Sequence, residues 1–236
     1  MSKERLFRFK RFAVSHSQSA IPVGMDGVLI GAWCSVSQAL RVLDAGTGCG
    51  LIALMCAQRS AEARITAIDI HSPSVEEAVY NFTTSPWARR LEARLIPFAE
   101  FAEKGFDLIV SNPPFFHAGV SPTLSDARLR ARHSGAFGPE ALLTQGAQML
   151  SESGRISLIA PAPDENPLCR TAEEAGLYMR RICRVSSVTA HPPVRVLLEA
   201  SRQPGPCEIT HLTIHTPDGD FTQAYRTLTH DFYLKF

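Results

Sequence analysis

Short apolar runs alternate along the chain with longer segments in which apolar residues recur at helical spacing. Strands are predicted by the runs at 64–70, 92–97, 106–111 and 155–161. Helices are predicted by the segments at 51–59, 73–83, about 139–151 and within 165–176. Further strands are expected at 178–188, 194–202 and 211–215. This alternation predicts an α/β fold built on a doubly wound, mostly parallel sheet.

Length and composition favour one domain. The chain has 236 residues, 45% of them hydrophobic, and no linker-like gap interrupts the alternation. A chain of this size can bury a sizeable core, so we expect a single domain over 1–236, with 1–35 as an N-terminal extension. No secretory signal and no run of transmembrane length is present, which predicts a cytoplasmic protein.

The cysteines and histidines do not predict a metal site. Six cysteines contain no CxxC pair and show no zinc spacing, so reduced thiols are expected. His211 and His215 have the spacing of metal ligands on a helix, but Thr213 and Ile214 between them favour a strand.

A glycine-rich turn follows an apolar strand that begins at Arg41. Glycines permit positive φ and a close approach of the backbone to a ligand, and a helix follows directly. A dinucleotide fingerprint would need its third glycine where Leu51 stands, so the spacing disfavours NAD. The pattern predicts a β-loop-α nucleotide site formed by Asp44, Gly46, Thr47, Gly48 and Gly50.

Asp69 ends the next apolar run, and a carboxylate at that place can accept hydrogen bonds from both hydroxyls of a ribose. A polar residue before a helix often serves as its N-cap, but Ser72 and Pro73 already supply an N-cap and a first helical residue. We therefore assign Asp69 and the adjacent Ile70 to the nucleotide site.

The tetrapeptide Asn112-Pro113-Pro114-Phe115 follows the strand 106–111. In an open α/β sheet, ligands bind at the carboxyl edge of the strands. Asn112 and Pro113 offer carbonyl acceptors, and Phe115 can stack on a ring. These groups suit a planar exocyclic amine, such as that of adenine, which donates N–H hydrogens. The alternative interpretation is an ordinary turn that ends a strand.

In combination, the glycine loop, Asp69 and the Asn-Pro-Pro-aromatic motif resemble the class I methyltransferases that use S-adenosylmethionine. Over almost the whole chain the sequence is similar, more narrowly, to the bacterial tRNA1(Val) (adenine(37)-N6)-methyltransferases. The segments that carry this likeness are 21–33, Asn81 with the following Ser85-Pro86-Trp87-Ala88, and 232–234.

The resemblance implies a Rossmann-like sheet with a C-terminal antiparallel hairpin at its edge, and S-adenosyl-L-methionine as the cofactor. It adds Asp26, Phe98 and Asn112 to the cofactor-binding residues, and places the N-terminal extension over the cofactor and the RNA. The implied reaction is methylation of N6 of adenine 37 in a tRNA anticodon loop, by direct displacement without a metal. A monomer is expected.

The sequence departs from that family at several places. Pro22 stands where a lysine is usual, and Met25 where a threonine is usual. The segment around Pro97 lacks the acidic residue that commonly contacts the cofactor's adenine, and Phe115 replaces the commoner tyrosine.

Two basic segments are candidates for RNA contact. Near the N-terminus, cations interleave with phenylalanines, which suits single-stranded RNA, but an edge strand with one apolar face fits the same pattern. The second segment lies in the long loop after the strand 106–111, where a run of arginines favours RNA contact. The candidate residues are Arg8, Lys10, Arg11, Arg128, Arg130, Arg132 and His133.

Two other functions remain open. Protein glutamine methyltransferases use the same Asn-Pro-Pro-aromatic group on a planar amide, although they usually carry a separate helical domain before the glycine loop. A catalytically silent RNA-binding protein of this fold is the second alternative.

Overall fold

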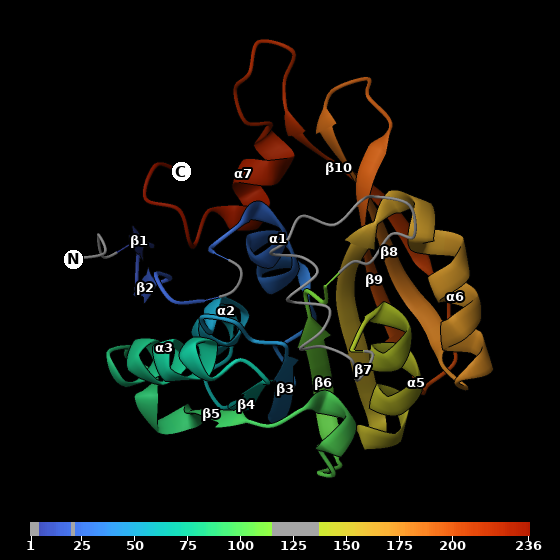
Figure 1. Ribbon diagram of the computed structural model, residues 1–236. Helices are drawn as coiled ribbons and strands as arrows, with labels where there is room; N and C mark the ends of the chain where they lie inside the picture. Colours follow the sequence, from blue (N-terminus) through green and yellow to red (C-terminus); the bar gives the residue numbers. More distant parts are fainter. Residues whose placement is uncertain (1–4, 20–21, 115–136) are drawn as a thin grey trace, which may run out of the picture.

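The computed structural model describes residues 5–19, 22–114 and 137–236. Its centre is an eight-stranded sheet with the order β10-β8-β9-β7-β6-β3-β4-β5 (Figure 1). The β8–β9 and β9–β7 pairs are antiparallel and all the others are parallel. The strands are β3 (Arg41–Ala45), β4 (Arg64–Asp69), β5 (Leu91–Leu95), β6 (Phe106–Ser111), β7 (Leu150–Pro161), β8 (Tyr178–Val188), β9 (Pro193–Ser201) and β10 (Glu208–His215).

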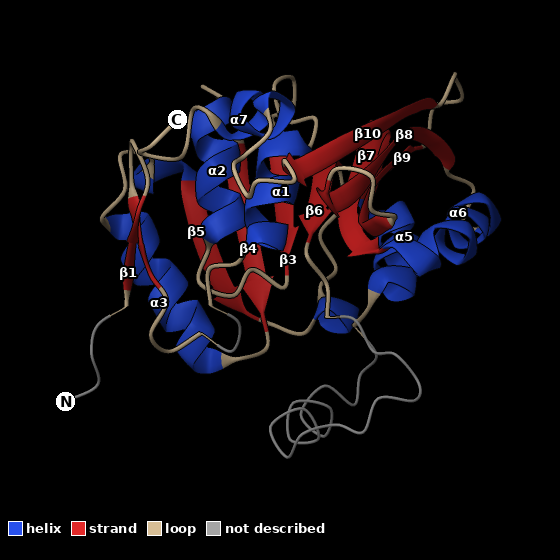
Figure 2. Ribbon diagram, turned by 90° about the horizontal axis from the view of Figure 1, so that it is seen from above, coloured by secondary structure: helices blue, strands red, loops and turns tan. Residues whose placement is uncertain are grey.

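Helices cover both faces of this sheet. One buried cluster joins the sheet to α1, α2, α3 and α7, and a second joins it to α5 and α6. Figure 2 shows α2 and α3 beside the half of the sheet that contains β3, β4 and β5, and α5 and α6 beside the other half. The α-helices are α1 (Met25–Trp33), α2 (Leu51–Arg59), α3 (Ser72–Thr83), α5 (Pro139–Met149), α6 (Glu165–Glu174) and α7 (Gln223–Thr229). Short 3₁₀ turns are η1 (Ala88–Arg90), η2 (Phe98–Glu100) and η3 (Ala162–Asp164).

The predicted α/β architecture is confirmed, with differences at particular boundaries. The helix expected over 139–151 ends at Met149, and β7 begins at Leu150 instead of 155. Gly154 therefore lies inside a strand instead of ending a helix. A Cβ atom there would lie 2.6 Å from the carbonyl oxygen of Phe106, so glycine lets β7 and β6 approach each other closely.

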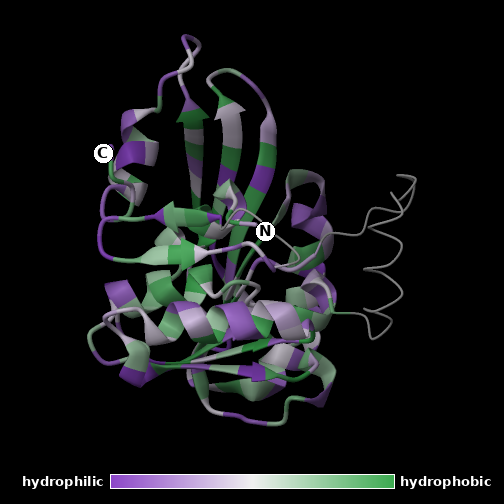
Figure 3. Ribbon diagram, turned by 60° about the vertical axis from the view of Figure 1, so that its left-hand side comes forward, coloured by the Kyte–Doolittle hydropathy of each residue, from purple (hydrophilic) through white to green (hydrophobic). Residues whose placement is uncertain are grey.

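The antiparallel hairpin of β8 and β9 is present, but its expected place at the sheet edge is wrong. Strand β10 pairs in parallel with β8 and forms that edge in the described structure. Leu212 and Ile214 of β10 are buried, so the strand has an apolar side to place against the core. Figure 3 shows mostly hydrophobic residues in the central strands and hydrophilic residues on the outer turns of helices.

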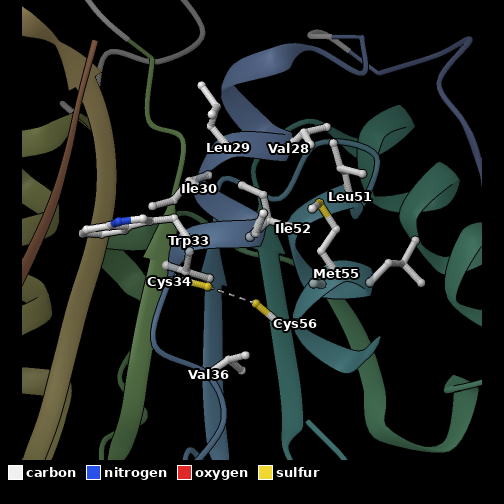
Figure 4. Close-up of a cluster of buried hydrophobic side chains, with 14 of the residues drawn as sticks. Val28, Leu29, Ile30, Trp33, Cys34, Val36, Leu51, Ile52, Met55 and Cys56 are labelled. Atoms are coloured by element: carbon white, nitrogen blue, oxygen red, sulfur yellow. Dashed lines mark hydrogen bonds between the residues drawn. The ribbon is translucent and has the colours of Figure 1, made fainter. Parts of the chain in front are cut away.

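Helix α1 had no clear amphipathic pattern in the sequence because its residues from Gly27 to Trp33 are all buried. It packs closely on α2, where a Cβ atom on Gly31 would lie 2.7 Å from the sulfur of Met55. Figure 4 shows this contact region, with the sulfur atoms of Cys34 and Cys56 3.7 Å apart.

Strand β9 holds α1 near both of its ends. At the C-terminal end, the fully buried carboxylate of Glu199 accepts hydrogen bonds from Ser35 and from Ser157, and pairs with Arg155 at 3.2 Å. At the N-terminal end, Arg195 Nε donates to Asp26 Oδ2 at 2.9 Å. Because α1 begins at the functional site described below, these contacts position one wall of that site.

The N-terminal residues form a separate two-stranded hairpin, β1 (Leu6–Arg8) and β2 (Ala13–Ser15), not an edge strand of the main sheet. Phe9 and Phe12 are buried, and their rings stack at 4.7 Å between centroids. Two of the phenylalanines that interleave with the cations are therefore core residues. For Phe9 and Phe12 the interpretation as an apolar face holds, instead of the interpretation as stacking partners for bases.

Candidate functional site

A cavity of about 420 Å³ opens at the carboxyl ends of β3, β4 and β6, the edge at which open α/β sheets bind ligands. Its volume is within the range of small-molecule sites. The walls come from five segments that are distant in sequence: 22–27, 46–52, 68–74, 96–98 and 112–114, with Phe137 added.

The glycine loop between β3 and α2 forms the floor. Gly46, Gly48 and Gly50 have φ values of 72°, 55° and 84°, which favour glycine. A Cβ atom on Gly48 would meet no heavy atom within 4 Å, so the space above this residue is open to a ligand. A Cβ atom on Gly50 would lie 2.5 Å from the Phe82 ring, so this third glycine is required by packing.

Asp69 joins the glycine loop to the next loop of the site. Its Oδ2 accepts the backbone N–H of Gly48 and its Oδ1 accepts the backbone N–H of His71, each at 2.9 Å. A carboxylate has about four lone-pair sites, so Asp69 keeps acceptor capacity toward the cavity that it lines. The N-cap of α3 is His71 instead of the expected Ser72, and it caps without a side-chain hydrogen bond.

Asp44 lies beneath the loop and does not line the cavity. It is fully buried, and its Oδ2 accepts hydrogen bonds from the Thr47 hydroxyl at 2.6 Å and from the Ala53 N–H at 3.1 Å. Its Oδ1 has no partner among the described residues. Burial raises the pKa of Asp44 to about 7, although the hydrogen bonds from Thr47 and Ala53 oppose this rise. Asp44 thus supports the turn from below.

The wall from α1 contains Asp26, whose carboxylate is paired with Arg195 and 28% exposed. Another part of the wall holds the Phe98 and Phe137 rings, whose centroids lie 5.0 Å apart. Together they give the cavity an apolar surface on which a planar group can stack.

The end of β6 brings the Asn-Pro-Pro motif to the same cavity. Ser111 Oγ donates to the Ala45 carbonyl at 2.6 Å and so ties the end of β6 to the end of β3. Asn112 and Pro114 line the cavity, whereas Pro113 is buried and does not. Phe115 lies outside the described residues, as do Arg128, Arg130, Arg132 and His133 of the long loop.

Most of the predicted nucleotide-site residues meet at this cavity. Those that line it are Asp26, Gly46, Thr47, Gly48, Asp69, Ile70, Phe98 and Asn112; Asp44 and Gly50 support the loop from outside. Sequence reasoning missed Phe137 and the pair His71 and Ser74, which are joined by a 2.8 Å hydrogen bond. The signal for His71 was its place two residues after Asp69. A Cβ atom on Gly46 would lie 2.8 Å from the Phe137 ring, and nothing in the sequence indicates this contact.

The N-terminal cations have different surroundings. Lys10 Nζ donates to the backbone carbonyls of His230 and Phe236, each at 2.6 Å. Its ammonium therefore joins the hairpin to the C-terminal segment. Arg8 is exposed in β1, and the Arg11 guanidinium lies 5.6 Å from the centroid of the Trp87 ring. Arg8 and Arg11 form no ion pair with any described carboxylate.

Within the described ranges, no helix is long and apolar enough to span a bilayer. In the same part of the chain, no three His, Cys, Asp or Glu side chains gather in an arrangement suited to a metal ion.

Comparisons with known proteins agree with this geometry. The family model described as methyltransferase small domain matches residues 29–166. A tRNA1(Val) (adenine(37)-N6)-methyltransferase of Vibrio parahaemolyticus serotype O3:K6 is 39% identical, over 97% of this chain and 95% of that protein. One of Aeromonas hydrophila subsp. hydrophila is also 39% identical, over 100% of both chains. A solved structure of a predicted O-methyltransferase from Agrobacterium tumefaciens shares the fold, with a TM-score of 0.67 at 18% identity over 88% of this chain and 96% of that one.

The raised pKa of Asp44 predicts a pH-dependent stability. Between pH 4 and about 7 the folded state retains a proton on Asp44 that the unfolded state has lost. The free energy of unfolding therefore decreases as the pH rises through that window. Asp44→Asn removes the titration and keeps an oxygen for Thr47 and Ala53. As the pH rises through this window, the free energy of unfolding of the variant should increase relative to that of the wild type by about 1.4 kcal/mol per pH unit, and at most by about 4 kcal/mol in total. Urea unfolding at several pH values tests this, and parallel stability curves would contradict it.

Proposed function

The chain belongs to the family of tRNA1(Val) (adenine(37)-N6)-methyltransferases, and on that premise we propose that it transfers a methyl group from S-adenosylmethionine to N6 of an adenine in a tRNA anticodon loop. By its relatives' name, the target is position 37 of tRNA1(Val). We place the reaction in the cytoplasm and expect a monomer to carry it out.

One observation carries this proposal. The cavity that begins at the glycine loop and Asp69 also reaches Asn112 and Pro114 at the end of β6. A nucleoside held by the loop and a planar amine held by Asn112 would therefore meet in one space. Methyl transfer requires the donor and the acceptor to be aligned in contact, and little further catalysis.

The described residues fit S-adenosylmethionine, which supplies a methyl group on a positively charged sulfur. Asp69 offers acceptors for ribose hydroxyls, and the open space above Gly48 lets a ligand reach the loop backbone. The Phe98 and Phe137 rings offer stacking for an adenine, in place of the acidic residue that the segment around Pro97 lacks. Asp26 can accept from the ammonium group at the methionine end.

Asn112 then holds the substrate amine. Asn112 lines the cavity, and its side-chain carbonyl accepts one N6 hydrogen. The second acceptor is proposed to be the backbone carbonyl of Pro113, although the residue is buried and does not line the cavity. Two such acceptors would turn the nitrogen lone pair toward the methyl group. The N–C bond forms as the C–S bond breaks, and the electron pair of that bond stays on sulfur. The nitrogen becomes acidic when it gains positive charge, so it loses its proton to water without a strong base. Phe115 is proposed to stack on the base.

The tRNA is proposed to approach over the N-terminal hairpin as well as the arginine-rich loop. From Arg5 to Met25 the sequence contains no Asp or Glu, although the whole chain has a net charge of only +1. Arg8 and Arg11 can meet phosphates because no described carboxylate neutralises them. Lys10 is removed from the proposed RNA contacts, since its ammonium is used by the C-terminal carbonyls.

Incubation with S-adenosylmethionine and total tRNA should yield N6-methyladenosine. Nucleoside mass spectrometry identifies the product, and mapping of the modified tRNA identifies the position. Methylated protein glutamine as the sole product would instead support the glutamine methyltransferase alternative. Cofactor binding with no transfer to any RNA would support a silent RNA-binding protein.

Asn112→Ala should act on the chemical step. Because the lost acceptor matters most as charge develops on nitrogen, kcat should fall on the order of a hundredfold, with near-normal affinity for S-adenosylmethionine. Asn112→Asp keeps an acceptor at the same place and should retain more activity. Single-turnover kinetics and calorimetry measure the two quantities. A wild-type rate in folded Asn112→Ala would remove Asn112 from catalysis.

Replacing Arg8 and Arg11 by Ala should weaken tRNA binding and leave kcat at saturating tRNA nearly unchanged. If each meets one phosphate of a single strand, the slope of log K against log salt should become shallower by about 0.7 per arginine. A matched control replaces Arg64 and Arg170, which are exposed at other parts of the surface. Equal slopes for the two double variants would assign Arg8 and Arg11 to an ordinary solvated surface.

A further inference from the structure

Asn81 of α3 is among the residues on which the resemblance to the family rests, yet it does not line the cavity. Its residue is 1% exposed, and its side chain forms three hydrogen bonds of 2.8 Å. Oδ1 accepts from the N–H of Ser15, and Nδ2 donates to the carbonyls of Ser15 and Cys49. Both N–H donors and the carbonyl oxygen of the amide are thus bonded to backbone groups.

The bond to Cys49 reaches the glycine loop. Cys49 lines the cavity, and its carbonyl is followed by Gly50, the N-cap of α2. The next residue of α3, Phe82, packs its ring against Gly50. Two successive side chains of α3, neither of which lines the cavity, therefore hold the last part of the loop in place.

The bonds to Ser15 reach a second wall of the same cavity. Ser15 is followed by His16, whose Nδ1 accepts from the N–H of Val23 at 3.4 Å, and Val23 lines the cavity. The carboxylate of Glu77, one helical turn before Asn81, holds residues 15–19 by hydrogen bonds from Ser15, Ser17, Gln18 and Ser19. Burial alone would raise the pKa of Glu77, but these bonds lower it below its usual value.

The chemistry of the site requires an amide at 81. Alanine would leave three buried backbone groups without partners, and each such group is costly. Aspartate would direct acceptors at two carbonyl oxygens that need donors. Asparagine satisfies one N–H and two carbonyls at once, which neither a hydroxyl nor a carboxylate can do.

We propose that Asn81 is a positioning residue for the cofactor. It sets the glycine loop through Cys49 and aligns that loop with the N-terminal wall through Ser15, so that affinity for S-adenosylmethionine depends on a side chain that never contacts it. This inference rests on the proposed function only for the identity of the cofactor. The hydrogen bond from Asn81 to Cys49 is independent of that function.

The test compares Asn81→Ala with Glu77→Gln in the full chain. Both variants disturb the attachment of residues 15–19, but only Asn81→Ala removes the bond to the glycine loop. Calorimetry without RNA should show S-adenosylmethionine binding weakened on the order of tenfold by Asn81→Ala and less than about threefold by Glu77→Gln. At saturating cofactor and tRNA, kcat of Asn81→Ala should stay near the wild-type value.

Equal affinities of Asn81→Ala and the wild type would overturn the proposal. Equal weakening by both variants at matched thermal stability would also overturn it, because the effect would then come from the N-terminal segment alone. Should Asn81→Ala fail to fold, Asn81→Ser keeps a hydroxyl for one carbonyl and allows the same comparison.

Amide hydrogen exchange of the unliganded protein separates this proposal from the proposed function. Exchange at residues 48–51 should be faster in Asn81→Ala and unchanged in Glu77→Gln. Unchanged exchange in Asn81→Ala would reject the positioning role whatever the cofactor is. A wild-type protein that binds no S-adenosylmethionine would reject the proposed function, while the exchange experiment would still decide the role of Asn81.

Discussion

The rest of the site depends on the turn from β3 into α2, whose backbone must be held in a conformation that favours glycine. The turn contains three glycines with positive φ, and its backbone N–H groups need partners. The N–H groups of Gly46 and Thr47 donate to the Ile68 carbonyl at 2.9 and 3.0 Å, and that of Gly48 donates to Asp69. Strand β4 therefore holds the loop of β3, and Asp69 is both a structural acceptor and a cavity residue.

The two chain ends contribute to the same scaffold although they lie far from it in sequence. The N-terminal hairpin packs Phe12 against Trp87 with ring centroids 5.7 Å apart, and Lys10 joins it to the C-terminal carbonyls. The segment that follows the hairpin is held by α3 and then enters the cavity wall. Residues that resemble an RNA-binding pattern in the sequence thus serve partly to attach the hairpin to the rest of the fold.

Strand β9 supports the cavity wall that α1 forms, because it contacts α1 near both ends. A buried carboxylate such as Glu199 is costly unless hydrogen bonds and cations surround it. Here two serine hydroxyls and Arg155 do so, and Arg181 adds a contact at 3.6 Å while its guanidinium lies 4.0 Å from the Trp33 ring centroid. Removing one partner would leave charge buried, so this end of α1 is fixed. The ion pair between Arg195 and Asp26 holds the other end beside the cavity.

The sequence by itself determined the α/β class, the glycine loop, Asp69 and the position of Asn112, because each depends on local rules. Apolar periodicity defines strands and helices, glycine spacing defines the loop, and parallel strands bring their carboxyl ends to one edge. The same rules could not predict the structural role of Lys10, because its hydrogen-bond partners are more than 200 residues away. They also could not recognise α1, because a helix buried on all sides has no polar face to reveal its period. Only the tertiary structure decided that Asp44 lies beneath the loop, that Phe137 joins the cavity and that Asn81 connects two of its walls, since each follows from packing between distant segments.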